Sequence, residues 1–199
     1  MAKKLRVLLV EDNPDDAEMI TRQLKRNGYE LTCTRVDTAK AMQAALQAQD
    51  WDVVLSDHNM PNFSSYGALD ILKASARDIP LILVSGSIGE DEAVRVLKAG
   101  MADYLLKDRV KRLPAAIEQA LHRAAERRAL AFSNTILTTQ QETSLDGILV
   151  VDERGKVISF NQRFVELWGV PPDLLRERDD ERVLRSVLDK VVNPQDVLV

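Results

Sequence analysis

The sequence predicts an α/β protein whose first part is a doubly wound, five-stranded parallel sheet. Two observations predict this fold class. Short apolar segments alternate five times with segments whose apolar residues recur at helical spacing. The apolar segments are also continuously hydrophobic, as expected of strands that helices cover on both sides. Right-handed crossover connections then place helices on both faces of the sheet.

The five predicted strands are short apolar runs bounded by residues that turn the chain. In the segment W-D-V-V-L-S-D-H-N-M-P, the β-branched pair Val53-Val54 belongs to a run too short for a stable helix. Pro61 then stops regular structure, so a buried strand is predicted here. The five predicted strands cover residues 5–10, 31–36, 51–56, 80–84 and 102–106.

Four helices are predicted between these strands from apolar spacing and from capping residues. Asn13 before Pro14 is a good N-cap for the first helix. Asp37 or Thr38 can cap the second helix, and Gly100 closes the fourth. The four predicted helices cover residues 14–27, 39–48, 66–76 and 90–99.

A long helix is predicted from Leu113 to about Thr143, since this stretch has no glycine and its one proline suits a first turn. Apolar residues near its start repeat with the spacing of a coiled-coil seam. We therefore interpret residues 126–145 as a connector helix that pairs with a second copy of the chain. The alternative is a lone amphipathic helix that caps the sheet and then frays. The seam residues are Leu113, Ile117, Ala120 and Ala124.

A different pattern starts at residue 146. Two apolar runs around the turn Asp152–Gly155 predict a β-hairpin over residues 147–160. Asn161 then caps a helix over Gln162–Trp168, and a further helix is predicted over Arg182–Val192. Residues 146–199 are too few for a stable domain on their own, so we expect them to be part of a larger domain in a longer protein.

Composition narrows the class of protein. The chain has 199 residues, of which 45% are hydrophobic and 29% charged, with a net charge of -4. This mild acidity argues against nucleic acid as the main partner. Cys33 is the only cysteine, so we expect no disulfide framework or thiolate metal site and interpret Cys33 as a small apolar strand residue. No segment resembles a signal peptide or a membrane span, so we expect a cytoplasmic protein without a membrane partner.

Polar residues follow the carboxyl ends of four predicted strands. Asp57 ends the third strand, and Glu11 and Asp12 follow the first. Ser85 follows the fourth strand and Lys107 the fifth. The first and third strands are neighbours in a doubly wound sheet, so three carboxylates converge and favour a divalent cation such as Mg²⁺. Together with the donors on Lys107 and Ser85, this set suits the transfer of a phosphoryl group to Asp57.

On these motifs, residues 1–125 resemble the receiver domain of two-component response regulators, which has a flavodoxin-like fold. The resemblance implies that Asp57 accepts a phosphoryl group from a histidine kinase or phosphotransfer protein. It implies that Glu11, Asp12, Asp57 and the backbone carbonyl of Asn59 hold Mg²⁺. A protein of this kind is regulatory rather than an enzyme.

The resemblance also implies a conformational switch. Phosphorylation draws Ser85 inward, and the aromatic side chain of Tyr104 follows it. The surface that changes consists of the fourth helix, the fifth strand and the fifth helix, which continues into the connector. We expect a homodimer through this surface and the connector helix.

Residues 146–199 resemble the first half of a PAS sensor domain. The resemblance rests on the predicted hairpin, the helix led by Asn161 and the aromatic residues in D-G-I-L-V-V-D-E-R-G-K-V-I-S-F-N-Q-R-F-V-E-L-W. We assign no ligand or cofactor to this segment. The resemblance suggests an output module beyond residue 199, such as a GGDEF-type cyclic-dinucleotide synthase or a histidine kinase, although the sequence contains the motif of neither.

Two alternatives remain open. The first is a scaffold whose receiver-type domain dimerises independently of phosphorylation. The second is a Mg²⁺-dependent aspartyl phosphatase, which is disfavoured because Asp57 ends the third strand rather than the first and is followed two residues later by Asn59 instead of an acid. Of the two histidines, His58 is a candidate rim residue that modulates access to Asp57. His122 lacks the following acid of a kinase phospho-acceptor.

Overall fold

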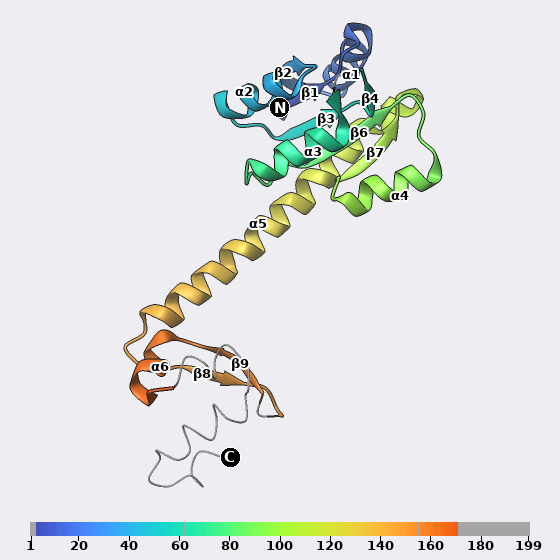
Figure 1. Cartoon of the computed structure of the whole chain (residues 1–199). Coiled ribbons are helices and arrows are strands. Elements are labelled where there is room, and N and C mark those ends of the chain that lie inside the picture. Colours follow the sequence, from blue (N-terminus) through green and yellow to red (C-terminus); the bar gives the residue numbers. More distant parts are fainter. Residues whose placement is uncertain (1–2, 62, 155, 171–199) are drawn as a thin grey trace. The chain divides into compact units, whose positions relative to one another are not determined.

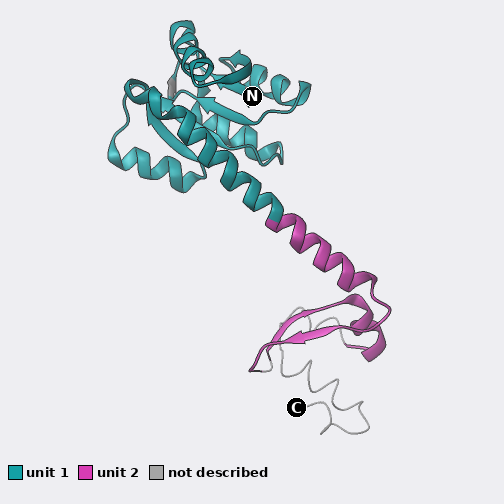
Figure 2. Ribbon diagram, turned by 180° about the vertical axis from the view of Figure 1, so that it is seen from behind, with its two compact units in different colours: residues 1–129 teal, residues 130–199 magenta. Residues whose placement is uncertain are grey.

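The structure is a computed structural model. It describes residues 3–61, 63–154 and 156–170, and within these ranges the side chain of Asn59 is not described. The chain divides into two compact units, Met1–Ala129 and Leu130–Val199 (Figure 2). We call them the N-terminal unit and the C-terminal unit and describe each by itself.

The N-terminal unit is built on a five-stranded sheet in which all neighbouring strands are parallel (Figure 1). The strand order is β2-β1-β3-β6-β7, which confirms the predicted doubly wound sheet and places the first and third strands side by side. Predicted and observed strand ends differ by two residues or fewer. The strands are β1 (Lys3–Val10), β2 (Tyr29–Val36), β3 (Val53–Ser56), β6 (Leu81–Ser85) and β7 (Asp103–Leu106).

Helices cover both faces of this sheet because alternate strand residues point to opposite sides. Val7 and Leu9 of β1 pack in one core cluster with α1 and the start of α5, whereas Leu8 and Val10 pack in another with α2, α3 and α4. This confirms the predicted helices and their placement on both faces of the sheet. The helices are α1 (Pro14–Arg26), α2 (Ala39–Ala48), α3 (Ser65–Ala74), α4 (Glu90–Ala99) and α5 (Leu113–Thr143).

Local capping chemistry explains where these helices begin and end. Asn13 accepts a hydrogen bond from the backbone N–H of Asp15 at 2.9 Å, as an N-cap does. Thr38, rather than Asp37, caps α2. Gly100 ends α4 at a φ of 109°, a left-handed conformation that favours glycine.

The start of α5 corrects one prediction from the sequence. The residues expected to form a coiled-coil seam are buried in the N-terminal unit, and those from Leu113 to Ala120 belong to the core cluster beneath β1, β3 and β6. The seam prediction was wrong because apolar residues three and four apart suit packing on a sheet as well as packing on a second helix. This stretch therefore caps the sheet. The buried seam residues are Leu113, Ile117, Ala120 and Ala124.

Two local elements of the N-terminal unit were not predicted. A short antiparallel hairpin, β4 (Asn59–Met60) and β5 (Phe63–Ser64), follows the loop after β3. A 3₁₀ helix, η1 (Lys107–Arg112), precedes α5. Both are too short to produce a periodic pattern in the sequence.

The described part of the C-terminal unit contains the end of α5, a hairpin and a short helix. The hairpin consists of β8 (Leu149–Val151) and β9 (Val157–Phe160), and α6 covers Gln162–Trp168 as predicted. Asn161 is buried, and its Oδ1 accepts from the N–H groups of Ile148 at 2.7 Å and Phe164 at 2.9 Å. The predicted helix at residues 182–192 lies outside the described residues.

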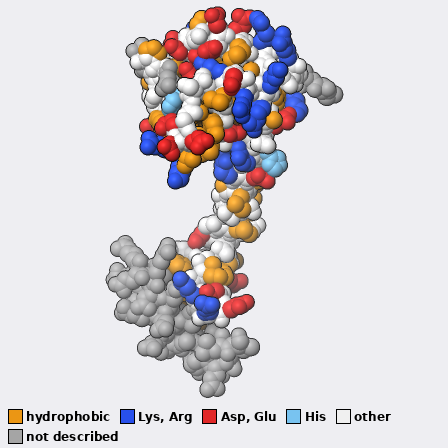
Figure 3. All heavy atoms as spheres, turned by 90° about the vertical axis from the view of Figure 1, so that its right-hand side faces the viewer, with side chains coloured by type: hydrophobic (Ala, Val, Ile, Leu, Met, Phe, Trp, Pro, Cys, Tyr) orange, Lys and Arg blue, Asp and Glu red, His pale blue; other side chains and the backbone are white. Residues whose placement is uncertain are grey.

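The surface of α5 beyond residue 129 carries apolar side chains. Figure 3 shows orange side chains exposed along this part of the helix, where Leu130, Phe132, Ile136 and Leu137 are 66%, 67%, 40% and 56% exposed. Across the described residues, no helix combines the length and apolar character needed to cross a membrane.

Candidate functional site

Backbone pairing brings the phospho-acceptor candidate next to the acidic pair. Asp57 directly follows β3, and its N–H donates to the carbonyl oxygen of Val10 at 2.8 Å. Glu11 directly follows β1, and its N–H donates to the carbonyl oxygen of Val36 at 2.9 Å. The parallel register of β1 with β2 and β3 therefore sets the carboxyl edge at which these acids meet.

The three predicted acids form one cluster. A carboxylate oxygen from each of Glu11, Asp12 and Asp57 lies within 4.8 Å of the other two. Glu11 is 1% exposed and Asp57 is 9% exposed, whereas Asp12 is exposed, so water screens the charges of Glu11 and Asp57 only weakly. Burial raises the pKa of Glu11 above its ordinary value, and the charge of Asp57 adds to this effect, whereas Lys107 opposes it.

These acids fit a hard divalent cation. Oε2 of Glu11 is buried, and among the described residues it accepts no hydrogen bond. Its 2.9 Å contact with Lys107 Nζ is an ion pair without hydrogen-bond geometry. The single ammonium group of Lys107 does not balance the three clustered carboxylates, and carboxylate oxygens are ligands that Mg²⁺ prefers.

Lys107 lies among three carboxylates at the start of η1. Its Nζ is 2.6 Å from Oδ2 of Asp16, 2.9 Å from Oε2 of Glu11 and 3.5 Å from Oδ1 of Asp57. Burial alone would lower the pKa of Lys107, but Asp16 and Glu11 outweigh it and hold the pKa above its ordinary value. The side chain is therefore a fixed positive charge beside Asp57.

Asp16 and Arg35 are two members of the site that sequence reasoning missed. Asp16 stands in the first turn of α1, where an acid also complements the helix dipole, so the sequence alone gave no reason to separate it from Asp15. Nη1 of Arg35 on β2 donates to the carbonyl oxygens of Glu11 and Asp12, both at 3.0 Å. No local sequence signal reveals this contact, because it depends on the pairing of β1 with β2.

The predicted switch residues lie on β6, which is next to β3, and on β7, which is next to β6 at the edge of the sheet. Ser85 is the last residue of β6 and is buried, and its hydroxyl donates to the carbonyl oxygen of Ser87 at 2.9 Å. Tyr104 lies on β7, paired in register with Leu83 of β6, and is half-buried. Asn59 lies on β4, two residues after Asp57.

The histidines and the cysteine have distinct surroundings. His58 is half-buried, with Nδ1 3.0 Å from Oγ of Ser65. His122 is exposed on α5 and pairs with Glu126 at 3.3 Å. Cys33 lies half-buried on β2, and burial raises its pKa to about 11, which fits the structural role predicted for it.

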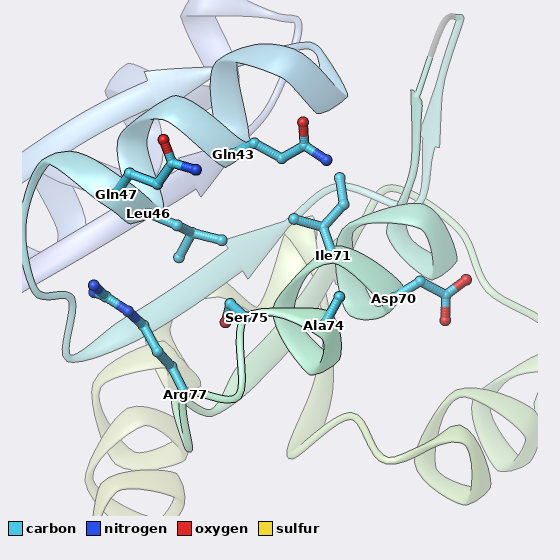
Figure 4. A pocket seen from close by; sticks show the side chains of 8 residues that line it. All are labelled: Gln43, Leu46, Gln47, Asp70, Ile71, Ala74, Ser75 and Arg77. Atoms are coloured by element: carbon cyan, nitrogen blue, oxygen red, sulfur yellow. The ribbon is translucent and has the colours of Figure 1, made fainter.

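A separate hollow lies between α2 and α3 and has a volume of about 750 Å³ (Figure 4). The apolar side chains of Leu46 and Ile71 lie between the two helices there, surrounded by polar groups. None of the site residues predicted from the sequence lines it. The lining residues are Gln43, Leu46, Gln47, Asp70, Ile71, Ala74, Ser75 and Arg77.

A doubly wound parallel sheet with an acidic cluster and a lysine at its carboxyl edge defines a signal-receiver type of domain. The family model of the response regulator receiver domain matches residues 7–118, and a PAS domain model matches residues 137–197. The chain therefore belongs to the response regulator receiver family of two-component signal transduction, and its later part matches the PAS family. Receiver domains of this family are regulatory and work with histidine kinases or phosphotransfer proteins.

Curated relatives and solved structures agree with this assignment. The transcriptional regulatory protein PrrA of Mycobacterium tuberculosis is 32% identical over 171 residues, which cover 85% of this chain and 69% of PrrA. The cell cycle response regulator CtrA of Brucella anthropi is 31% identical over 167 residues, covering 83% of this chain and 66% of CtrA. The receiver domain of the Francisella response regulator 1452 has the same fold, with a TM-score of 0.53, 24% identity and coverage of 60% of this chain and 98% of that one.

Proposed function

We propose that this protein is a response regulator in which Asp57 accepts a phosphoryl group from a histidine kinase or phosphotransfer protein in a Mg²⁺-dependent reaction. The observation that carries the proposal is the convergence of Glu11, Asp12 and Asp57 with Lys107 at one edge of the sheet. The buried Oε2 of Glu11, which accepts no hydrogen bond among the described residues, supports a metal-binding role for this cluster.

The proposed reaction is the transfer of a phosphoryl group from a phosphohistidine. A carboxylate oxygen of Asp57 forms a bond to phosphorus while the phosphorus–nitrogen bond of the donor breaks. The electron pair of the broken bond stays on the imidazole nitrogen, which takes up a proton. Lys107 is placed to hold the phosphoryl oxygens by charge, since its ammonium already lies 3.5 Å from Oδ1 of Asp57.

Four groups of this chain would hold the metal. They are the carboxylates of Glu11, Asp12 and Asp57 and the backbone carbonyl of Asn59. Bound Mg²⁺ supplies neutralisation of the negative charge on the phosphoryl oxygens. Arg35 positions the two acids Glu11 and Asp12, because its guanidinium group donates hydrogen bonds to their backbone carbonyl oxygens.

The proposed output is a change in surface structure. The phosphoryl oxygens on Asp57 compete with the carbonyl of Ser87 for the hydroxyl of Ser85. Ser85 then moves inward toward Asp57, and the side chain of Tyr104 follows it. The affected surface consists of α4, β7 and the start of α5, and we propose that it forms a homodimer together with the connector, residues 126–145. The exposed apolar residues of α5 from Leu130 to Leu137 support pairing with a second copy.

The proposal is tested with a small phosphoryl donor. Purified protein is incubated with phosphoramidate and Mg²⁺, and the phosphorylated fraction is measured by intact-protein mass spectrometry. We expect labelling of the wild type, none of Asp57→Asn, and none when Mg²⁺ is chelated. A wild type that takes up no phosphate, or an Asp57→Asn variant that takes it up equally, would contradict the proposal.

Light scattering tests the dimer separately. Mass is compared with and without beryllofluoride and Mg²⁺, which together mimic an aspartyl phosphate, for the wild type and Asp57→Asn. A change in mass for the wild type alone would connect Asp57 with assembly. A dimer of constant mass in every condition would reject oligomer switching. If partner binding were also the same for the wild type and Asp57→Asn, the result would favour the phosphorylation-independent scaffold.

A further inference from the structure

We infer that Asp16 is a positioning residue that retains Lys107 in the unphosphorylated state and thereby slows phosphoryl uptake by Asp57. This inference rests on the proposed function, because it assigns a role to Asp16 within the same site. The juxtaposition that carries it is the short contact between Lys107 and Asp16, an acid outside the cluster of three carboxylates that fits the metal.

The distances rank the partners of Lys107. Its Nζ is nearest to Asp16, at 2.6 Å, and donates a hydrogen bond to Oδ2 of this residue. Glu11 lies at 2.9 Å without hydrogen-bond geometry, and Asp57 lies at 3.5 Å. Lys107 is thus bound most closely to an acid on α1 rather than to the phospho-acceptor.

The contact is sheltered enough to have an energetic effect. The side chain of Lys107 is 16% exposed and that of Asp16 is 30% exposed. A charge-assisted hydrogen bond in this setting is stronger than an ion pair on open surface, although solvent still weakens it. Asp16 is held in place by the first turn of α1, whose N-cap Asn13 lies three residues earlier.

A bound divalent cation increases the importance of Asp16. Glu11 and Asp57 would hold Mg²⁺, whose charge would neutralise two of the three carboxylates near Lys107 and would repel the ammonium group. Asp16 is then the one partner of Lys107 whose charge remains uncompensated. An incoming phosphoryl group must attract Lys107 away from Asp16, and this exchange opposes the reaction.

Two effects of opposite direction follow for Asp16→Asn. The freed ammonium pairs more closely with Glu11 and Asp57, so it competes with Mg²⁺ and weakens metal binding. At saturating Mg²⁺, the same ammonium is more available to phosphoryl oxygens, so the rate of phosphorylation rises. We expect a rate increase of about three- to tenfold, since the contact is a partly exposed charge-assisted hydrogen bond.

The experiment measures both effects on the full chain. Phosphorylation of Asp57 by phosphoramidate is followed by intact-protein mass spectrometry across a Mg²⁺ titration, and Mg²⁺ binding without donor is followed by amide chemical shifts in NMR spectra. Asp15→Asn is the matched control, because it removes the same charge from the same turn of α1 and Asp15 makes no ion pair in the described ranges. Asp16→Glu restores the charge and is expected to restore wild-type behaviour.

The outcomes distinguish a failure of the role inferred for Asp16 from a failure of the proposed function. A faster Asp16→Asn at saturating Mg²⁺, with weaker Mg²⁺ binding and with Asp15→Asn close to wild type, supports the inference. If the wild type is phosphorylated at Asp57 but Asp16→Asn is phosphorylated no faster than Asp15→Asn, the role of Asp16 is overturned and the proposed function stands. A wild type that is not phosphorylated overturns the proposed function and this inference with it.

Discussion

Nε2 of His58 lies 3.8 Å from Oε1 of Glu92 and so connects the residue after Asp57 with the first turn of α4. The same Oε1 accepts a hydrogen bond from the hydroxyl of Tyr66 at 2.8 Å, and Nδ1 of His58 lies 3.0 Å from Oγ of Ser65. Side chains from α3 and α4 therefore meet at the residue that directly follows Asp57.

Replacement of Glu92 by alanine should loosen the start of α4. The variant loses the hydrogen bond from Tyr66 and the contact with His58, and a loss of about 1 kcal/mol corresponds to roughly fivefold faster local opening. Amide hydrogen exchange over residues 88–95 measures this effect. Asp91→Ala is the matched control, because it removes the same charge from the same helix turn without either contact. Equal exchange in the two variants would mean that only the helix dipole is affected.

Ser85→Ala should separate phosphorylation from the switch. The hydroxyl of Ser85 donates to the carbonyl of Ser87 in this structure, so it must break this hydrogen bond to donate to a phosphoryl group. We expect a decrease in the phosphorylation rate of about tenfold or less, because Ser85 is one donor among several charged groups. The chemical shifts of Tyr104 should then change little on phosphorylation. Ser87→Ala keeps its backbone carbonyl and should behave as wild type; loss of switching in Ser87→Ala as well would contradict a specific role for Ser85.

Much of the fold and the central acids were predictable from the sequence for a physical reason. In a parallel sheet the carboxyl ends of the strands share one edge, so residues that directly follow β1 and β3 must approach each other. The convergence of Glu11, Asp12 and Asp57 follows from this rule and is observed. The Mg²⁺ ligand set and the phospho-acceptor role remain proposals.

The residues that were missed depend on contacts with no sequence period. Asp16 reaches Lys107 over 91 positions of sequence, and Arg35 reaches the acidic pair only because β2 lies beside β1. The buried start of α5 was assigned to a coiled-coil seam because a helix on a sheet and a helix on a helix require nearly the same apolar spacing. In each of these cases the helix or strand was predicted correctly, and what was missed was the group that the side chain contacts.

Asp52→Asn should lower the stability of the N-terminal unit in a pH-dependent manner. Oδ2 of Asp52 accepts from the backbone N–H of Arg6 at 2.7 Å, and Oδ1 lies 2.8 Å from Nη2 of Arg6. Burial pushes the pKa of Asp52 upward, but the bonds and charge of Arg6 outweigh it and hold the pKa below 3.8. The stabilising contribution is therefore complete above the unfolded-state pKa and is lost as the pH falls through the lower folded-state value.

Melting curves of wild type and Asp52→Asn from neutral to acidic pH measure this effect. We expect the variant to melt a few degrees lower at neutral pH and the difference to shrink as the pH falls below 3.8. Asp37→Asn changes the charge equally, and Asp37 makes no ion pair within the described part of the chain. A difference that stays constant with pH would show that the carboxylate charge of Asp52 is not what stabilises the fold.

Ile117→Ala and Ile136→Ala should have opposite consequences although both residues lie on α5. Ile117 is fully buried in the core cluster beneath the sheet, whereas Ile136 is 40% exposed. Urea unfolding should show a loss of about 2–5 kcal/mol for Ile117→Ala, which leaves a cavity in the core, and a change within about 0.5 kcal/mol for Ile136→Ala. Light scattering should show weaker dimerisation for Ile136→Ala alone. If Ile117→Ala instead dissociates a dimer without loss of stability, the seam predicted from the sequence is formed in solution and the burial of Ile117 against the sheet is not its main role.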